Sequence, residues 1–224
     1  YGYNRDKKKG KQQLVIGLLL AEGLPFAHKV WKGNTPDKTT LQDAVTQAKE
    51  LGVTNFVFVA DRGLITDKNI LWLEDQKLEY IIATKRRNNK LISSLMEKDI
   101  SGKVTKVHEE ANRAYYLCYN EEVAKEQINA INEIKKRIEV KINSIKNPTE
   151  HKILEAAGKA KRLFIFSFEN TFSYSINKAA WDYENKIAGK YIIVTNNHKL
   201  DKEQICSTYK ELIDVEQCFG ELKH

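Results

Sequence analysis

Three nearly uninterrupted apolar runs constrain the fold of this 224-residue chain more than any other feature. They occupy residues 13–20, 56–60 and 191–195, and each has the length of a β-strand. A strand that is apolar on both faces needs cover on both faces, so the runs predict a sheet with helices on each side. The composition suits such a core, because 42% of the residues are hydrophobic and 30% are charged.

Helical patterns separate these strands along the first hundred residues. Residues 24–31 alternate between apolar and polar and follow residues 13–20 after a short turn, which predicts an antiparallel pair. Thr35 and Thr66 are suited to cap helices, and Gly52 is suited to end the first of them. The resulting order, strand–strand–helix–strand–helix–strand–helix, predicts an α/β fold with a mixed sheet flanked by helices.

The middle of the chain has a different pattern. Residues 103–119 predict a small hairpin, and residues 121–146 carry isoleucines three and four positions apart, which predicts a long amphipathic helix. The apolar face of this helix either packs within an insertion or mediates self-association. We therefore divide the chain into a first core part (1–99), an insertion subdomain (100–186), and a return strand with a final helix (187–224).

The net charge of the chain and the length of its longest apolar run limit the functions that it can have. The net charge of +7 suits a nucleic-acid partner, although many other proteins are equally basic. The longest apolar run, at 14–21, is too short to span a bilayer, and no secretory signal precedes it. Three scattered cysteines without a CxxC motif indicate free thiols. We expect a cytoplasmic protein without a membrane partner.

Asp61 is the first candidate for chemistry, because it directly follows the apolar run at 56–60. Ligand and metal sites in sheets flanked by helices collect at the carboxyl ends of the strands. Arg62 and Gly63 come next, and glycine permits a tight exit from the strand. The alternative is an Asp that only starts a turn by bonding its own backbone.

The predicted final helix, at about 201–223, carries the second set of candidates. Tyr209, Leu212, Glu216 and Lys223 stand at offsets of 0, 3, 7 and 14 and fall within about 60° of one another around a helix. One face would thus present a phenol, an apolar side chain, a carboxylate and an ammonium. By itself the pattern is more typical of a solvated helix face.

This spacing resembles the YREK signature of IS4-type DDE transposases, which reads Tyr, two residues, Arg, three residues, Glu, six residues, Lys. Three of the four positions match, and Leu212 stands where the family has Arg. Other stretches resemble the family in the same order along the chain, at residues 12–25, 33–37, 59–63 and 189–196. The pattern is most similar to the IS1634-like branch, and the middle of the chain matches only as a variable insertion.

The resemblance implies a ribonuclease-H-like fold with a large, mostly helical insertion before the last catalytic helix. In that family the first strand carries the first catalytic Asp. Residues 13–20 look like the second strand, so we expect the first strand and its Asp to precede Tyr1. Asp6 is a poor substitute, since it lies in a lysine-rich loop.

The resemblance also implies roles for single residues. Asp61 and Glu216 become the catalytic residues and the ligands of two divalent cations, Mg²⁺ or Mn²⁺. The implied DNA-binding residues are Tyr209, Lys223, Arg62 and Lys210. The implied activity is transposition, in which a dimer cleaves phosphodiesters at transposon ends and transfers strands into target double-stranded DNA at the nucleoid.

Two other interpretations stay open at this point. Leu212 lacks the bidentate phosphate grip of the signature Arg, which would suit a decayed, non-catalytic DNA-binding or assembly remnant. A ribonuclease-H-like nuclease without a joining step is the third possibility, and the YREK-like helix argues against it. The basic clusters at 7–11 and 85–87 either attract DNA of any sequence or serve solubility.

Overall fold

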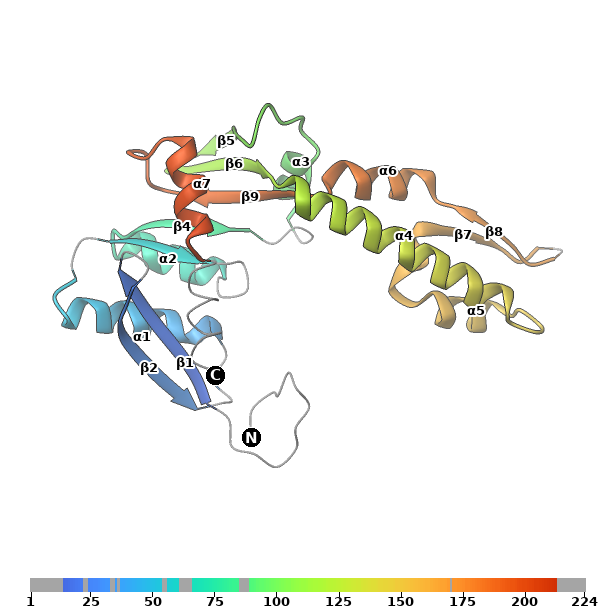
Figure 1. Ribbon diagram of the computed structural model, residues 1–224, viewed down its shortest axis with the longest axis horizontal. Coiled ribbons are helices and arrows are strands. Elements are labelled where there is room, and N and C mark those ends of the chain that lie inside the picture. Colours follow the sequence, from blue (N-terminus) through green and yellow to red (C-terminus); the bar gives the residue numbers. More distant parts are fainter. Residues whose placement is uncertain are drawn as a thin grey trace.

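A five-stranded mixed sheet forms the centre of the chain (Figure 1). The computed structural model describes residues 14–21, 24–32, 35, 37–53, 56–60, 66–84, 89–169 and 171–212, with side chains from residue 27 onward except 37–39. The strands run in the order β3-β4-β9-β6-β5. Their bounds are β3 Val57–Ala60, β4 Glu79–Ala83, β5 Val104–Glu110, β6 Arg113–Tyr119 and β9 Lys190–Thr195. β3 and β4 are parallel, whereas the other neighbours are antiparallel.

Helices cover both faces of this sheet. One face shares a core with α1 (Asp37–Glu50), α2 (Asp67–Asp75), α3 (Lys90–Met96) and the carboxyl end of α6 (Lys178–Ile187). The other face is covered by α7 (Lys202–Lys210). Tyr80 and Ile82 belong to the first core, whereas Ile81 belongs to the second together with Ile193 and Ile205. The predicted α/β class, a mixed sheet flanked by helices as in ribonuclease-H-like folds, is confirmed.

The first two strands form a sheet of their own within the described residues. β1 (Leu14–Ala21) pairs antiparallel with β2 (Leu24–Lys32), as the sequence predicted, with an irregularity between Leu19 and Leu20. Helix α1 lies against this pair. Trp31 Nε1 donates to Asp43 Oδ2 (2.9 Å), and Gln47 Nε2 donates to the His28 carbonyl oxygen (3.2 Å). These bonds fix β2 to the helix that leads into β3.

Local signals set several helix boundaries where the sequence placed them. The hydroxyl oxygen of Thr66 accepts a hydrogen bond from the Asn69 backbone N (3.3 Å), which caps α2 as predicted. Gly52 follows α1 with a φ of 82°, a left-handed conformation that favours glycine. Asn120 caps the long helix of the insertion by accepting from the Val123 backbone N (3.2 Å).

The predicted long helix and hairpin are both present. The hairpin at 103–119 forms β5 and β6 and joins the central sheet. After β6 the chain leaves the sheet as α4 and extends away from it (Figure 1). The elements of this extension are α4 (Glu121–Asn143), α5 (Glu150–Ala157), the 3₁₀-helix η1 (Gly158–Leu163), β7 (Phe164–Ser167), β8 (Ser173–Ile176) and α6. β7 and β8 pair antiparallel in a separate two-stranded sheet.

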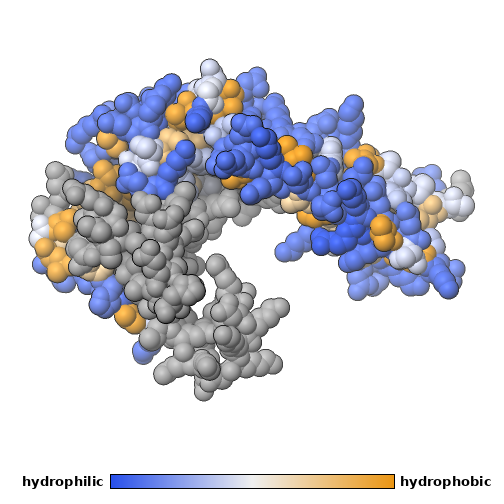
Figure 2. Space-filling model, in the orientation of Figure 1, coloured by the Kyte–Doolittle hydropathy of each residue, from blue (hydrophilic) through white to orange (hydrophobic). Residues whose placement is uncertain are grey.

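Part of the isoleucine stripe of α4 is buried inside this extension. Ile138 and Ile142 are 6% and 1% exposed and share a core with Ile153, Leu163 and Phe164. Hydrophilic residues cover most of the visible outer surface of α4 and its neighbours (Figure 2). The interpretation of the stripe as a packing surface is therefore confirmed, and self-association stays a prediction.

None of the helices in the described ranges combines the length and the apolar character that crossing a bilayer requires.

Candidate active site

Most of the predicted site residues lie outside the described residues. Asp61, Arg62, Glu216 and Lys223 are among them. Tyr209 and Lys210 lie within α7, and Leu212 comes after its C-cap residue, Glu211. The structure therefore locates the elements that lead to the carboxylates: β3, which ends at Ala60, and α7, which precedes Glu216.

The carboxyl end of β3 is firmly placed in the sheet. Ala60 is fully buried and pairs in register with Ile82 of the parallel strand β4, so both strands finish at the same end of the sheet. β9 runs antiparallel to β4, so the first residues of β9, Lys190 and Tyr191, also lie at this end. The next residue after Ala60 is Asp61. A side chain at that position has the location expected for ligands in such sheets.

Helix α7 begins with a capping box. The Asp201 carboxylate accepts from the Gln204 backbone N (2.8 Å), and the Gln204 side chain accepts from the Asp201 backbone N (3.0 Å). Ile205 and Cys206 are then buried against the sheet, and the helix packs over β5, β4 and β3. The face of α7 that carries these residues is the apolar one, which explains why the helix lies flat on the strands.

The last turn of α7 lies near the end of the sheet where β3 and β4 finish. The ring of Tyr209 is 5.7 Å from the ring of Tyr191, between centroids, and Tyr191 is one of the first residues of β9. Tyr209 is half-buried, whereas Lys210 is exposed to solvent. α7 also contacts β3 directly, so the described elements that precede Asp61 and Glu216 in the chain pack against each other.

A cluster of two thiols and a phenol joins α7 to the sheet, and the sequence did not reveal it. Cys118 of β6 and Cys206 of α7 are both free and buried, and the Tyr191 hydroxyl lies 3.8 Å from Cys206 Sγ. A hydrogen bond with Cys206, together with burial, raises the pKa of the Cys118 thiol, and burial raises the pKa of the Tyr191 phenol. The strand pattern at 113–119 was visible beforehand, but the face on which Cys118 meets α7 depends on the tertiary fold.

The donor chemistry of the candidate residues fits a divalent cation. Carboxylate oxygens are the hard ligands that Mg²⁺ and Mn²⁺ prefer, and Asp61 and Glu216 supply them. Within the described ranges, no group of three or more His, Cys, Asp or Glu side chains is arranged to hold a metal ion.

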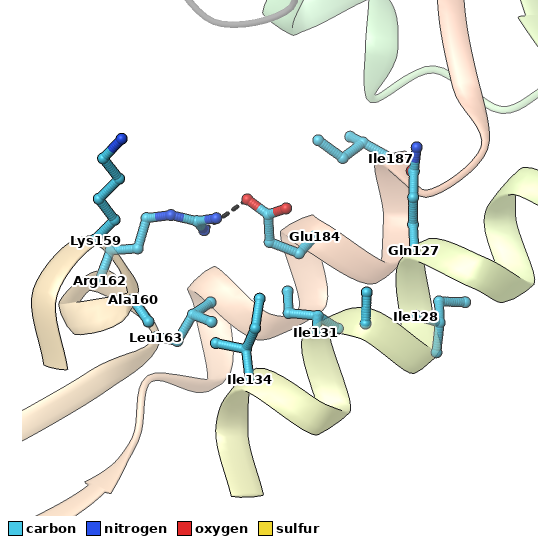
Figure 3. Close-up of a pocket in the computed structure, with 11 residues that line it drawn as sticks. Gln127, Ile128, Ile131, Ile134, Lys159, Ala160, Arg162, Leu163, Glu184 and Ile187 are labelled. Atoms are coloured by element: carbon cyan, nitrogen blue, oxygen red, sulfur yellow. Dashed lines mark ion pairs between the residues drawn. The ribbon is translucent and has the colours of Figure 1, made fainter. Parts of the chain in front are cut away.

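A pocket of about 320 Å³ lies in the extension and not at the end of β3 (Figure 3). It opens between α4, η1 and α6, with Ile131, Ile134 and Leu163 among its apolar lining. At its rim Arg162 Nη1 forms an ion pair with Glu184 Oε1 at 2.6 Å. One ion pair above an apolar floor ties η1 to α6, and it does not supply a set of acid, base and nucleophile.

Comparison with known proteins gives one match. The family model described as "Transposase DDE domain" matches residues 1–224. Neither the curated proteins nor the solved structures gave a significant match. The family match spans the whole chain and agrees with the mixed sheet flanked by helices. The chain belongs to the DDE transposase domain family.

Proposed function

We propose that this protein carries out transposition of the IS4 type, cleaving phosphodiesters at transposon ends and transferring the strands into target DNA. The observation that carries the proposal is the convergence of β3 and α7. Ala60 ends a strand at the same end of the sheet where Tyr209 packs on Tyr191. β3 and α7 precede Asp61 and Glu216 in the chain and contact each other, which supports a metal site shared by the two carboxylates.

In this proposal Asp61 and Glu216 are the catalytic residues and hold two divalent cations, Mg²⁺ or Mn²⁺. When bound, such a pair activates a water or a DNA 3′-hydroxyl and stabilises the leaving oxygen. The remaining residues act on the DNA backbone. The proposed phosphate-binding residues are Tyr209, Lys223, Arg62 and Lys210. Ammonium, guanidinium and phenol groups all bind phosphate oxygens, which positions the scissile bond without reading its sequence.

Leu212 sets this chain apart from the YREK pattern. An arginine at that position would add a bidentate grip on phosphate, which leucine cannot provide. Lys210 is exposed two positions earlier and supplies a compensating point charge. We propose that the protein acts as a dimer on double-stranded DNA at the nucleoid. Residues 1–99 and 187–224 form the catalytic core together with β5 and β6, which pair within the central sheet, and the rest of the predicted insertion (100–186) forms the extension.

The experiment is a cleavage and strand-transfer assay with the full-length protein on the ends of its own element. Asp61→Ala and Glu216→Ala are expected to abolish metal-dependent products, because each removes a metal ligand. Asp182→Ala is the matched control, since Asp182 is an exposed carboxylate on α6 of the extension. Chelation of the metal is expected to stop cleavage while salt-sensitive DNA binding persists.

Three results would contradict the proposal. Unchanged cleavage by Glu216→Ala would remove that residue from the site. DNA binding without any cleavage by the parent protein would instead indicate a non-catalytic copy, and Leu212→Arg would then test whether the lost grip is the cause. Cleavage without strand transfer would identify a nuclease and reject the joining step.

A further inference from the structure

Three consecutive polar side chains, Thr195, Asn196 and Asn197, fasten the end of β9 to the start of β4, and we call them the β9 latch. The Asn196 Oδ1 accepts a hydrogen bond from the Tyr80 backbone N (2.8 Å), and its Nδ2 donates to the Leu78 carbonyl oxygen (3.0 Å). The Thr195 hydroxyl donates to the Tyr80 carbonyl oxygen. Asn196 thus continues the ladder between β9 and β4 with its side chain, in place of its backbone.

Asn197 connects the β9 latch to the loop that precedes α7. It is 3% exposed, and its Nδ2 donates to Glu79 Oε2 (2.8 Å). Its Oδ1 accepts from the backbone N of Lys199 and of Leu200, both at 2.9 Å. The Lys199 ammonium donates to the other oxygen of Glu79 (2.9 Å). The loop is therefore bound to β4 immediately before α7 begins.

Asn196 is the member of the latch that bridges two backbone groups, the carbonyl of Leu78 just before β4 and the N–H of Tyr80 within it. Leu78 and Tyr80 are 7% and 0% exposed, so their N–H and carbonyl groups have little access to water at this point. Removing the Asn196 amide would leave a buried donor and a buried acceptor unpaired. The end of β9 would then shift or admit water, and the loop that starts α7 would shift with it.

The start of α7 governs the position of its far end. A helix of nine residues is about 14 Å long, so a tilt of about 5° at its start moves its last turn by about 1 Å. The last turn contains Tyr209, which packs on Tyr191 near the end of β3. A displacement of about 1 Å at a catalytic group can reduce a rate roughly a hundredfold.

We propose that Asn196 is a positioning residue of the active site, which acts through α7. By pairing its side-chain amide with the backbone of Leu78 and Tyr80, it fixes where α7 starts, and α7 is the helix that leads along the chain to Glu216. This inference rests on the proposed metal-binding roles of those two carboxylates. Asn196 touches neither the DNA nor the metal in this proposal.

The test uses a pair of matched substitutions in the full-length protein, Asn196→Ala and Asn177→Ala. Asn177 also accepts from one backbone N, that of Ala180 (3.2 Å), and donates to one carbonyl oxygen, that of Arg162 (3.2 Å), but it lies in the extension. Three quantities are measured for each variant: the melting temperature, the Mg²⁺ concentration for half-maximal cleavage, and Mn²⁺ binding followed by electron paramagnetic resonance of the free ion.

Asn196→Ala is expected to lose at least as much stability as Asn177→Ala, because the backbone partners of Asn196 are buried, so the metal requirement is compared at temperatures where both variants are folded. Only Asn196→Ala is expected to need more metal, by about tenfold, and to bind Mn²⁺ correspondingly less tightly. Asn196→Asp keeps the acceptor for the Tyr80 backbone N and loses the donor to Leu78, so its metal requirement should be intermediate. This variant preserves the test if Asn196→Ala does not fold.

An unchanged metal requirement and unchanged Mn²⁺ binding in the Asn196 variants would overturn the inference, provided that the parent cleaves DNA and Asp61→Ala does not. Equal shifts in the Asn196 and Asn177 variants would also overturn it, because the effect would then be general destabilisation. Failure of the proposed function looks different. In that case the parent protein shows no metal-dependent cleavage, or Asp61→Ala keeps it, and both proposals fall together.

Discussion

Gly189→Ala should destabilise this protein far more than substitution of another glycine with the same backbone conformation. Gly189 has a φ of 69°, and its neighbours close it in on the side where a Cβ would project. An added Cβ would overlap the Asn120 carbonyl oxygen and lie 2.6 Å from the Ala124 Cβ. Gly102 has a φ of 79° with nothing within 4 Å of the corresponding position, so it is the matched control.

The two variants separate backbone strain from crowding. A left-handed backbone costs an L-residue about 1–2 kcal/mol, and both variants pay it. Crowding adds about 1–3 kcal/mol for Gly189→Ala only, since Ala124 and Asn120 belong to the first turn of α4 and would have to shift. We expect losses of about 1–2 kcal/mol for Gly102→Ala and about 2–5 kcal/mol for Gly189→Ala.

Urea unfolding followed by circular dichroism measures both losses, with the denaturant slope checked for constancy. Equal losses in the two variants would refute the reasoning, because they would mean that α4 yields to the added methyl without cost. A smaller loss for Gly189→Ala than for Gly102→Ala would refute it more strongly.

Two further predictions concern stability. The Glu74 carboxylate accepts from Arg113 Nε and Nη2 (2.7 Å each) and from the Tyr80 hydroxyl (2.8 Å), and the Arg113 hydrogen bond lowers the pKa of Glu74 below 4.5. Glu74→Gln should therefore cost about 2 kcal/mol near neutral pH, and the difference from the parent should vanish as the pH falls through the lowered pKa of Glu74, in melting curves across pH. Asn120→Ala removes the cap on Val123 and should cost about 1 kcal/mol in urea unfolding, with no loss expected only if water replaces the cap.

Local patterns were sufficient to predict much of the secondary structure. The apolar runs at 56–60 and 191–195 became β3 and β9, since a strand covered on both faces has few polar positions. The cap at Thr66 needed only one side chain and one nearby N–H. The isoleucine spacing in α4 was visible because helical periodicity repeats over many turns.

Pairing between distant strands could not be predicted in the same way. β9 lies between β4 and β6, although more than a hundred residues separate it from β4 along the chain. Nothing in its apolar sequence distinguishes one neighbour from another, because backbone hydrogen bonds are alike for all strands. The meeting of Cys118 with Cys206 depends on that pairing and escaped prediction for the same reason.

In the candidate site, too, features set by local spacing could be predicted from the sequence, whereas long-range contacts could not. The spacing of Tyr209, Leu212 and Glu216 follows from helical geometry and could be written down from the sequence. The role of Asn196 could not be predicted from the sequence, because its two partners, Leu78 and Tyr80, lie far away in the chain. Asp61 and Glu216 stay predictions, since they lie outside the described residues.

The two ends of the extension that contains α4 and α6 are paired with each other where they meet the sheet. Tyr119, the last residue of β6, pairs directly with Lys190, the first residue of β9, and the Asn120 backbone N donates to the Gly189 carbonyl oxygen (2.9 Å). Residues 121–188 thus connect β6 to β9 in the way that a hairpin turn connects two antiparallel strands. The closure entropy of such a loop rises only slowly with its length. The part of the extension before the carboxyl end of α6, which itself packs on the sheet, can therefore change in length while β6 and β9 keep their register.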